Sequence, residues 1–181
     1  MDLASSFKML ATYNQRMNEQ LIAVCQQLTA EQLQKETHSF FPTVMDYWNH
    51  ILFGDLIMLQ RLVANNIVVL DTATAERLPI AKGIHDTFVD DLLSLKTLRH
   101  TVDRAYISMT RDFDTNTFDK KIHYITTEGQ AIEKNVGEFC QHIFNHQTHH
   151  RGQLTCLLSQ FGLDFGCTDL PMIVPEGSYI Q

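Results

Sequence analysis

Hydrophobic residues recur every three or four positions over four long stretches of the chain, the spacing of helices that bury one face. Pro42 stands where a helix would begin, and Gly162 stands where the last one would end. Thr29 and Gln32 form the pattern of a capping box, which starts a short turn of helix. The pattern therefore predicts four long helices, over residues 5–28, 43–64, 86–111 and 136–161.

The hydrophobic period changes between the third and fourth of these helices. Ile122, Tyr124 and Thr126 alternate with polar residues, and the sequence TEGQ follows with a glycine suited to a turn. Asn135 and Glu138 then form a capping pattern at the start of the last helix. We expect one all-α domain over residues 1–181, with residues after Gly162 mostly a tail. Its predicted architecture is a four-helix bundle of up-down type with a longer crossover, and a small β-hairpin insert before the last helix.

Composition narrows the possible partners. Apolar residues make up 44% and charged residues 19% of the chain, which is typical of a globular protein. The formal net charge of −7 argues against binding to nucleic acid or anionic lipid. The sequence contains no run of about 18 apolar residues, so it predicts no membrane span. The N-terminus lacks the apolar core of a signal peptide. The four cysteines form no C-x-x-C pair, and Cys140 and Cys156 fall in helical patterns that favour burial. These features favour a reduced, cytoplasmic protein.

The stretch FNHQTHHRGQ, residues 144–153, carries three of the nine histidines. On a helical wheel His146 and His150 fall at the edge and inside of the apolar stripe, whereas His149 lies outside it and His142 is marginal. Two imidazoles four positions apart can bind one metal ion from a single helix. Gln147 stands where the glutamate of an H-E-x-x-H protease would be, so that catalytic base is absent. The spacing alone leaves open a simpler role, histidines that satisfy polar contacts at the core.

A third candidate ligand lies on the second predicted helix. His50 belongs to YWNHILFGD, and Gly54, one turn later, leaves room for another group to approach the backbone. Asp46, one turn earlier, is the nearest carboxylate; it could act as a base, orient the His50 imidazole or favour the helix N-terminus. The alternative for His50 is a core histidine that is hydrogen-bonded to a neighbouring helix.

Three stretches of the chain together resemble the DinB family of DinB/YfiT-like metalloenzymes. They are LATYNQRMNEQLIAVCQQLTAEQL, SFFPTVMDYWNHILFGDLIMLQRL and NHQTHHRGQLTCLLSQFGLDFGCTDL, in the order in which the family has them. The resemblance implies a four-helix bundle with a metal ion held by three histidines. Carried over by motif, these ligands are His50, His146 and His150.

Three imidazoles leave a divalent ion with an open coordination position, which is typical of catalytic sites. Zinc and nickel both suit imidazole ligands. The open position would serve a metal-dependent hydrolase that activates water, or an S-transferase that binds a thiolate. Thiol-dependent S-transferases and isomerases in the resembled superfamily favour the second.

The expected partner is therefore a small-molecule substrate, with a low-molecular-weight thiol. A non-catalytic metal-binding stress-response protein is the alternative. The sequence assigns no catalytic residue, and the resemblance makes a homodimer plausible.

Other residues of these motifs receive structural predictions. Asp55 and Arg151 recur in the family signatures, and on their helices they point away from the predicted metal site. We interpret them as an ion pair between helices. Gly152 would permit close helix approach, while Gln153 and Tyr47 could line the metal site.

Overall fold

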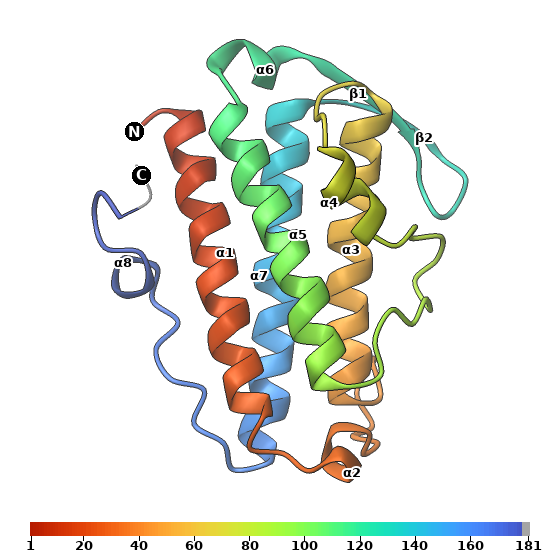
Figure 1. Cartoon of the computed structure of the whole chain (residues 1–181), viewed down its shortest axis with the longest axis vertical. Helices are drawn as coiled ribbons and strands as arrows, with labels where there is room; N and C mark the ends of the chain where they lie inside the picture. Colours follow the sequence, from red (N-terminus) through yellow and green to blue (C-terminus); the bar gives the residue numbers. More distant parts are fainter. Residues whose placement is uncertain (179–181) are drawn as a thin grey trace.

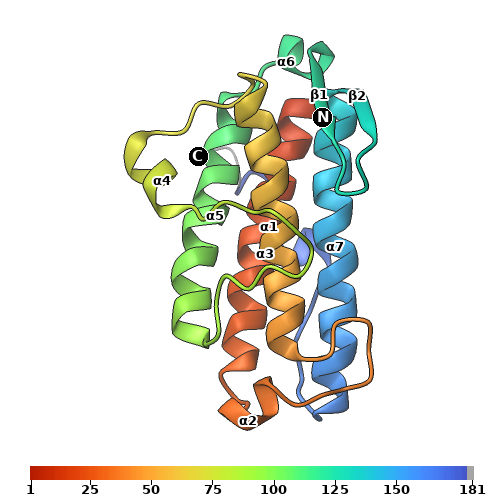
Figure 2. The ribbon, with the colours of Figure 1, turned by 90° about the vertical axis from the view of Figure 1, so that its right-hand side faces the viewer.

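The computed structural model describes residues 1–178 and is mostly helical. Its four long helices lie side by side along a common direction (Figures 1 and 2). Helix α1 contacts α5 and α7, and α3 contacts the same two helices, so the four form a ring around a shared apolar core. The bounds of these helices are α1 Leu3–Cys25, α3 Val44–Ala64, α5 Leu92–Asp112 and α7 Val136–Gln160.

Two predicted helix boundaries were wrong, and local hydrogen bonds explain one of them directly. Helix α5 begins at Leu92 rather than at residue 86, because the Asp91 side chain caps it by accepting hydrogen bonds from the backbone N–H groups of Leu93 and Ser94. Phe88 precedes the helix, and its backbone N–H donates to the Asn49 side chain at 2.8 Å. Helix α1 ends at Cys25, three residues before the predicted end at residue 28, and a turn follows.

The connection between α3 and α5 runs back along the whole molecule. Helices α3 and α5 therefore point the same way, while α1 and α7 point the other way (Figure 1). This connection contains the short helix α4 (Thr72–Arg77), which the sequence pattern did not predict. At the opposite end of α3, the short helix α2 (Ala30–Leu33) begins with the predicted capping box of Thr29 and Gln32.

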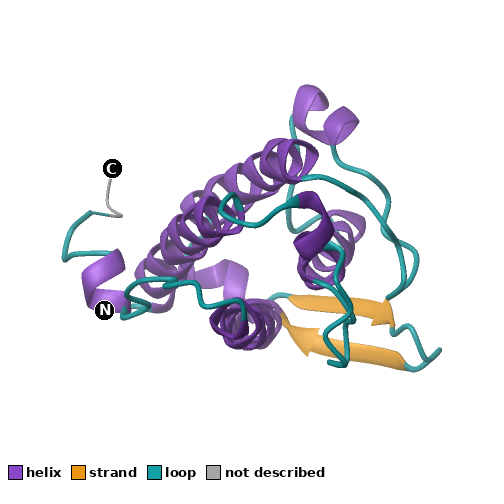
Figure 3. Cartoon of the chain, turned by 90° about the horizontal axis from the view of Figure 1, so that it is seen from below, coloured by secondary structure: helices purple, strands orange, loops and turns teal. Residues whose placement is uncertain are grey.

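The predicted hairpin is present. After the short helix α6 (Thr115–Asp119), strand β1 (Lys121–Ile125) pairs antiparallel with β2 (Ala131–Asn135), with Tyr124 opposite Ile132. Figure 3 shows the hairpin at one side of the helices. Asn65, just beyond α3, fixes it there, because its side chain donates to the His123 carbonyl and accepts from the His123 N–H, both at 2.9 Å.

The segment after α7 is largely extended, as predicted, apart from the short helix α8 (Leu170–Ile173). It lies against α1, where the Tyr13 hydroxyl donates to the Thr168 carbonyl at 2.7 Å. In residues 1–178 we find no helix that is both long and apolar enough to span a membrane.

Aromatic and aliphatic side chains from all four long helices fill the core, including the fully buried Trp48 and Tyr106. Cys140 is buried as predicted, but Cys156 is exposed, which corrects that prediction. Cys156 lies about 150° around α7 from the centre of its apolar stripe, so it faces solvent.

Candidate metal centre

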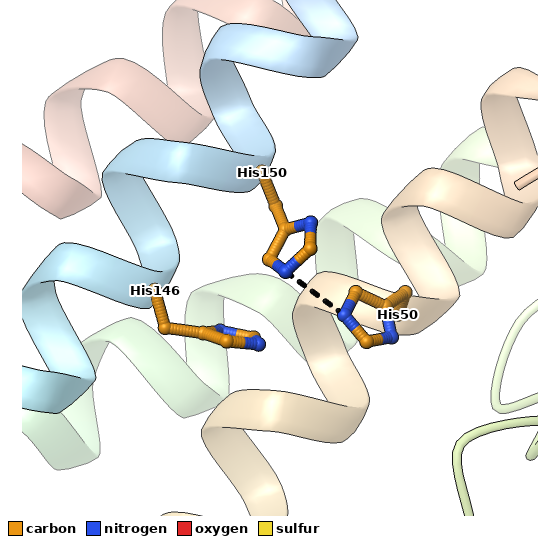
Figure 4. A group of neighbouring side chains, drawn as sticks. All are labelled: His50, His146 and His150. Carbon is orange, nitrogen blue, oxygen red and sulfur yellow. Dashed lines mark hydrogen bonds between the residues drawn. The ribbon is translucent and has the colours of Figure 1, made fainter. Parts of the chain in front are cut away.

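The structure brings His50, His146 and His150 together (Figure 4). One ring nitrogen from each lies within 4.8 Å of the others, and the two Nε2 atoms of His50 and His150 are 3.0 Å apart. Imidazole nitrogens bind zinc at about 2 Å, so ligands of one ion lie roughly 3–4 Å apart. The three side chains therefore fit a single divalent ion after small rotations.

Two rigid helices supply these side chains. His146 and His150 stand one turn apart on α7 and point toward α3, from which His50 points back (Figure 4). Helix α3 starts at Val44, and a capping box formed by Thr43 and Asp46 stabilises this end of the helix, which is close to His50. The ligand candidates thus lie on regular structure rather than on loops.

Gly54 makes room for the His146 ring. A Cβ atom built on Gly54 would lie 2.8 Å from His146 Nδ1 and closer still to Cε1, well inside van der Waals contact. This confirms the expectation that a group approaches the backbone at Gly54.

A Gly54→Ala variant is expected to bind a divalent ion about 10- to 100-fold more weakly than wild type, the range typical of losing a group that orients a ligand. The added methyl group must displace the His146 ring, because the ring is the flexible partner in that contact. Isothermal titration calorimetry with Zn²⁺ measures the change.

Gly152→Ala is the matched control. Apart from its own helix backbone and chain neighbours, no heavy atom in residues 1–178 lies within 4 Å of a Cβ built on Gly152, which also corrects the prediction that this glycine permits close helix approach. We expect unchanged metal affinity and a stability gain of about 0.5–1 kcal/mol, because alanine favours a helix over glycine. Equal metal affinity in the two variants would contradict the role assigned to Gly54.

Burial keeps the three imidazoles neutral. It lowers the pKa of His50 to about 3, with the neighbouring His150 and His146 adding to the effect. Burial and then His150 lower the pKa of His146 to about 4. The pKa of His150 is also lowered by burial, and the hydrogen bond between its Nδ1 and the Gln153 side-chain oxygen opposes this shift. Neutral imidazole is the form that binds metal, so the site is ready for an ion at neutral pH.

The second nitrogen of each ring meets a different environment. His150 Nδ1 lies 2.8 Å from the Gln153 side-chain oxygen, so Gln153 does reach the site, as predicted. The Nδ1 atoms of His50 and His146 are buried and have no hydrogen-bond partner within residues 1–178. Unpartnered buried nitrogens are costly, and a bound ligand at the centre would satisfy one nitrogen of a ring. At the centre itself, the Nε2 atoms of His50 and His150 face each other, so an ion there would satisfy these nitrogens and not His50 Nδ1.

Asp46 does not orient His50. Its carboxylate accepts hydrogen bonds from the Thr43 hydroxyl at 2.7 Å and the Thr43 N–H at 3.0 Å. Of the three roles left open for Asp46, the structure shows the one at the helix N-terminus.

Phe41, which the sequence pattern did not single out, packs directly on the centre. Its ring stacks on His50 with 4.1 Å between centroids and meets His150 edge-on at 6.0 Å. Tyr47 contacts Phe41 with 5.2 Å between centroids, so it supports the wall of the site. In the sequence, Phe40 and Phe41 stand just before the helix that carries His50, but this pair does not specify which of the two rings faces the centre.

The remaining histidines lie outside the group. His149 is exposed, with its ring 4.7 Å from that of His150, and His142 is exposed, with its ring 6.1 Å from that of His146. The helical wheel therefore separated the inward pair from His149 correctly. The group also excludes His38, His85, His100 and His123.

Asp55 and Arg151 do not form the predicted ion pair. Asp55 instead pairs with Arg99 of α5 at 2.5 Å, and it accepts a hydrogen bond from Gln147 of α7 at 2.8 Å. Arg151 donates to the Asn14 side chain of α1. The prediction failed because it considered two helices, whereas a third helix supplies the cation that faces Asp55.

The two residues nevertheless belong to one buried polar network. Arg99 lies 3.0 Å from Asp103, which also accepts hydrogen bonds from Asn14 at 3.2 Å and Asn18 at 3.0 Å. Through Asn14 the network reaches Arg151, next to His150 on α7. Polar contacts thus connect all four long helices beneath the histidines.

Comparison with known proteins bears on the family and the fold of the chain. The DinB family profile matches residues 4–174. Protein DinB of Bacillus subtilis (strain 168) is 23% identical over 161 residues, which cover 88% of each chain. A crystal structure of a DinB-like protein from Bacillus cereus matches with a TM-score of 0.56 at 18% identity, over 83% of this chain and 89% of that one. Because the profile spans nearly the whole sequence, the chain belongs to the DinB family.

Proposed function

We propose that the chain is a single-domain metalloprotein that binds one divalent transition ion, zinc or nickel, through His50, His146 and His150. The observation that carries this proposal is the meeting of three neutral imidazoles from two helices, with ligand atoms within 4.8 Å of one another. We assign the ring of four long helices to the up-down four-helix bundle class with one long crossover, and we assign residues 1–181 to a single domain.

The centre offers an open coordination position. Within residues 1–178, no aspartate, glutamate, cysteine or further histidine joins the three. Zinc sites with three protein ligands are of the catalytic kind, whereas structural sites are closed by a fourth. A divalent ion bound here would supply Lewis acidity to a small molecule in that position.

Transfer of a thiol to a small electrophile fits the surroundings better than hydrolysis. Hydrolysis needs a general base near the reacting atoms, but Asp46 is occupied at the start of α3 and Asp55 is paired with Arg99. Thiol transfer needs only a thiolate. Its sulfur forms a bond to the electrophilic carbon, the leaving group departs with the electron pair, and the thiol proton passes to solvent. We therefore propose a cytoplasmic S-transferase whose partners are a low-molecular-weight thiol and a small electrophile.

Thiol-dependent conjugation of monochlorobimane tests this proposal. Metal-loaded wild type is expected to accelerate the reaction, and His146→Ala is expected to return it to the uncatalysed rate, because a ligand is lost. His149→Ala is the control, since His149 is an exposed neighbour outside the group. Equal turnover by wild type and His146→Ala would contradict the proposal. Stoichiometric metal without turnover of any thiol would support a non-catalytic metal-binding role instead.

A further inference from the structure

Arg61 lies on the same face of α3 as His50. The two positions differ by about 20° around the helix and by about 16 Å along it. Long side chains on a helix lean toward its N-terminus, which here is the direction of the histidines. Arg61 therefore stands above the centre on the surface between α3 and α7, which we call the α3–α7 seam and define by Ile57, Arg61, His142 and His146.

The hairpin holds the Arg61 guanidinium in place. Its central carbon lies 4.3 Å from the centroid of the Tyr124 ring, and its Nη2 donates to the Ile125 carbonyl at 3.2 Å. Tyr124 in turn packs on Phe139 of α7 with 5.4 Å between ring centroids. These contacts use one face and one N–H group of the guanidinium, which leaves its other donors free.

In the described part of the chain, no carboxylate is in direct contact with this cation, although Glu128, in the turn of the hairpin, acts on it from a longer distance. Within residues 1–178, Arg61 takes part in no salt bridge, although the chain as a whole is acidic. The guanidinium is half-buried, and burial lowers its pKa. A partly desolvated cation with no carboxylate in direct contact can still bind an anion, because charge-assisted hydrogen bonds gain strength as water is excluded.

His142 occupies the stretch of the α3–α7 seam between Arg61 and the histidine centre. His142 lies one turn before His146 on α7, with 6.1 Å between the two rings. Partial burial of the ring and then the charge of Arg61 lower the pKa of His142, although the residue as a whole is exposed. A ligand that occupied the centre and extended along the seam toward Arg61 would therefore pass His142.

We propose that Arg61 binds the carboxylate or phosphate end of the thiol whose sulfur occupies the histidine centre. The distance from the centre to the guanidinium, on the order of 10 Å by helix geometry, selects a thiol with its anionic group several bonds from the sulfur. This inference rests on the proposed function, because it names the class of thiol used at the same site. Attachment of the hairpin to α3 does not depend on Arg61 alone, because Asn65 already makes two hydrogen bonds to β1.

A matched pair of thiols tests the proposal. Binding of 6-mercaptohexanoate and 6-mercaptohexanol to the Co²⁺-loaded protein is followed by the thiolate-to-cobalt charge-transfer absorption. Wild type is expected to prefer the anionic thiol about tenfold. In Arg61→Gln the ratio falls to about one, while affinity for the neutral thiol and the Co²⁺ content stay unchanged.

Two controls separate this effect from net charge and from chain length. Arg104→Gln removes an exposed cation from α5 with the same change in net charge, and it is expected to keep the tenfold preference. Mercaptoacetate, which is too short to reach Arg61, is expected to bind equally well to wild type and to Arg61→Gln. A preference for 6-mercaptohexanoate that persists in Arg61→Gln would overturn the proposal.

A measurement on metal-free protein keeps this test independent of the thiol chemistry. Inorganic phosphate is titrated while the ¹⁵N–¹H signal of Arg61 Nε is followed, with the signal identified by its loss in Arg61→Gln. Saturable movement of that signal, without similar movement for Arg104, would support an anion site at Arg61 even if no thiol bound the metal. A signal that does not move would count against the anion site.

Discussion

A His50→Ala variant is expected to lose the stoichiometric divalent ion that wild-type protein binds. His50 is the only ligand candidate from α3, so its removal leaves two imidazoles on one helix and opens the centre to water. We expect a loss in affinity larger than the roughly 10- to 100-fold typical of residues that only orient a ligand. Elemental analysis of dialysed protein measures the ion per chain.

His149→Ala is the matched control for this variant, because His149 neighbours the centre without belonging to it. It is expected to retain the ion. Circular dichroism should show the same helical content in both variants, since alanine is tolerated at helical positions. One equivalent of ion retained in His50→Ala would sink the three-histidine assignment.

The sequence pattern predicted the long helices because each has an apolar face with helical period. It misplaced the start of α5 because Phe88 continues the apolar spacing, although the side chain of Asp91 caps the helix. A period of hydrophobic residues can extend past a cap, since a loop residue packed on the core follows the same spacing. The capping residue Asp91 is the sequence feature that locates the start of α5.

The inward pair on α7 was predictable from helix geometry, whereas its partner was not. Wheel positions separated His146 from His149 within one helix, but they say nothing about which helix lies opposite. His50 was identified with the help of the family resemblance, and only the packing of α3 on α7 brings it to the pair.

The buried polar network had a signal that the sequence interpretation did not use. Leu95, Arg99, Val102 and Tyr106 fall on one face of α5, so a charged residue stands in the middle of an apolar stripe. Asn14 and Asn18 interrupt the apolar face of α1 in the same way. Polar residues at core positions are paired when they are buried, so they indicate a network between helices even when the partners are unknown.

Removal of the central cation of this network should strongly destabilise the fold. An Arg99→Leu variant is expected to lose about 3–5 kcal/mol of unfolding free energy, the range for breaking a buried ion pair from one side. Asp55 and Asp103 would remain buried, each about 1–2% exposed, with no guanidinium between them. Chemical denaturation followed by circular dichroism measures the change. Arg104→Leu, an exposed arginine of the same helix, should shift stability by no more than about 0.5 kcal/mol.

The cost in Arg99→Leu could come from unpaired charge or from lost packing, and a combined variant separates the two. Arg99→Leu with Asp55→Asn and Asp103→Asn removes both negative charges while it keeps side chains of nearly the same size. If unpaired charge dominates, this triple variant recovers part of the lost stability, because neutral amides cost less to bury than carboxylates. A triple variant no more stable than Arg99→Leu would assign the loss to packing, and the network would then hold the helices by shape rather than by charge.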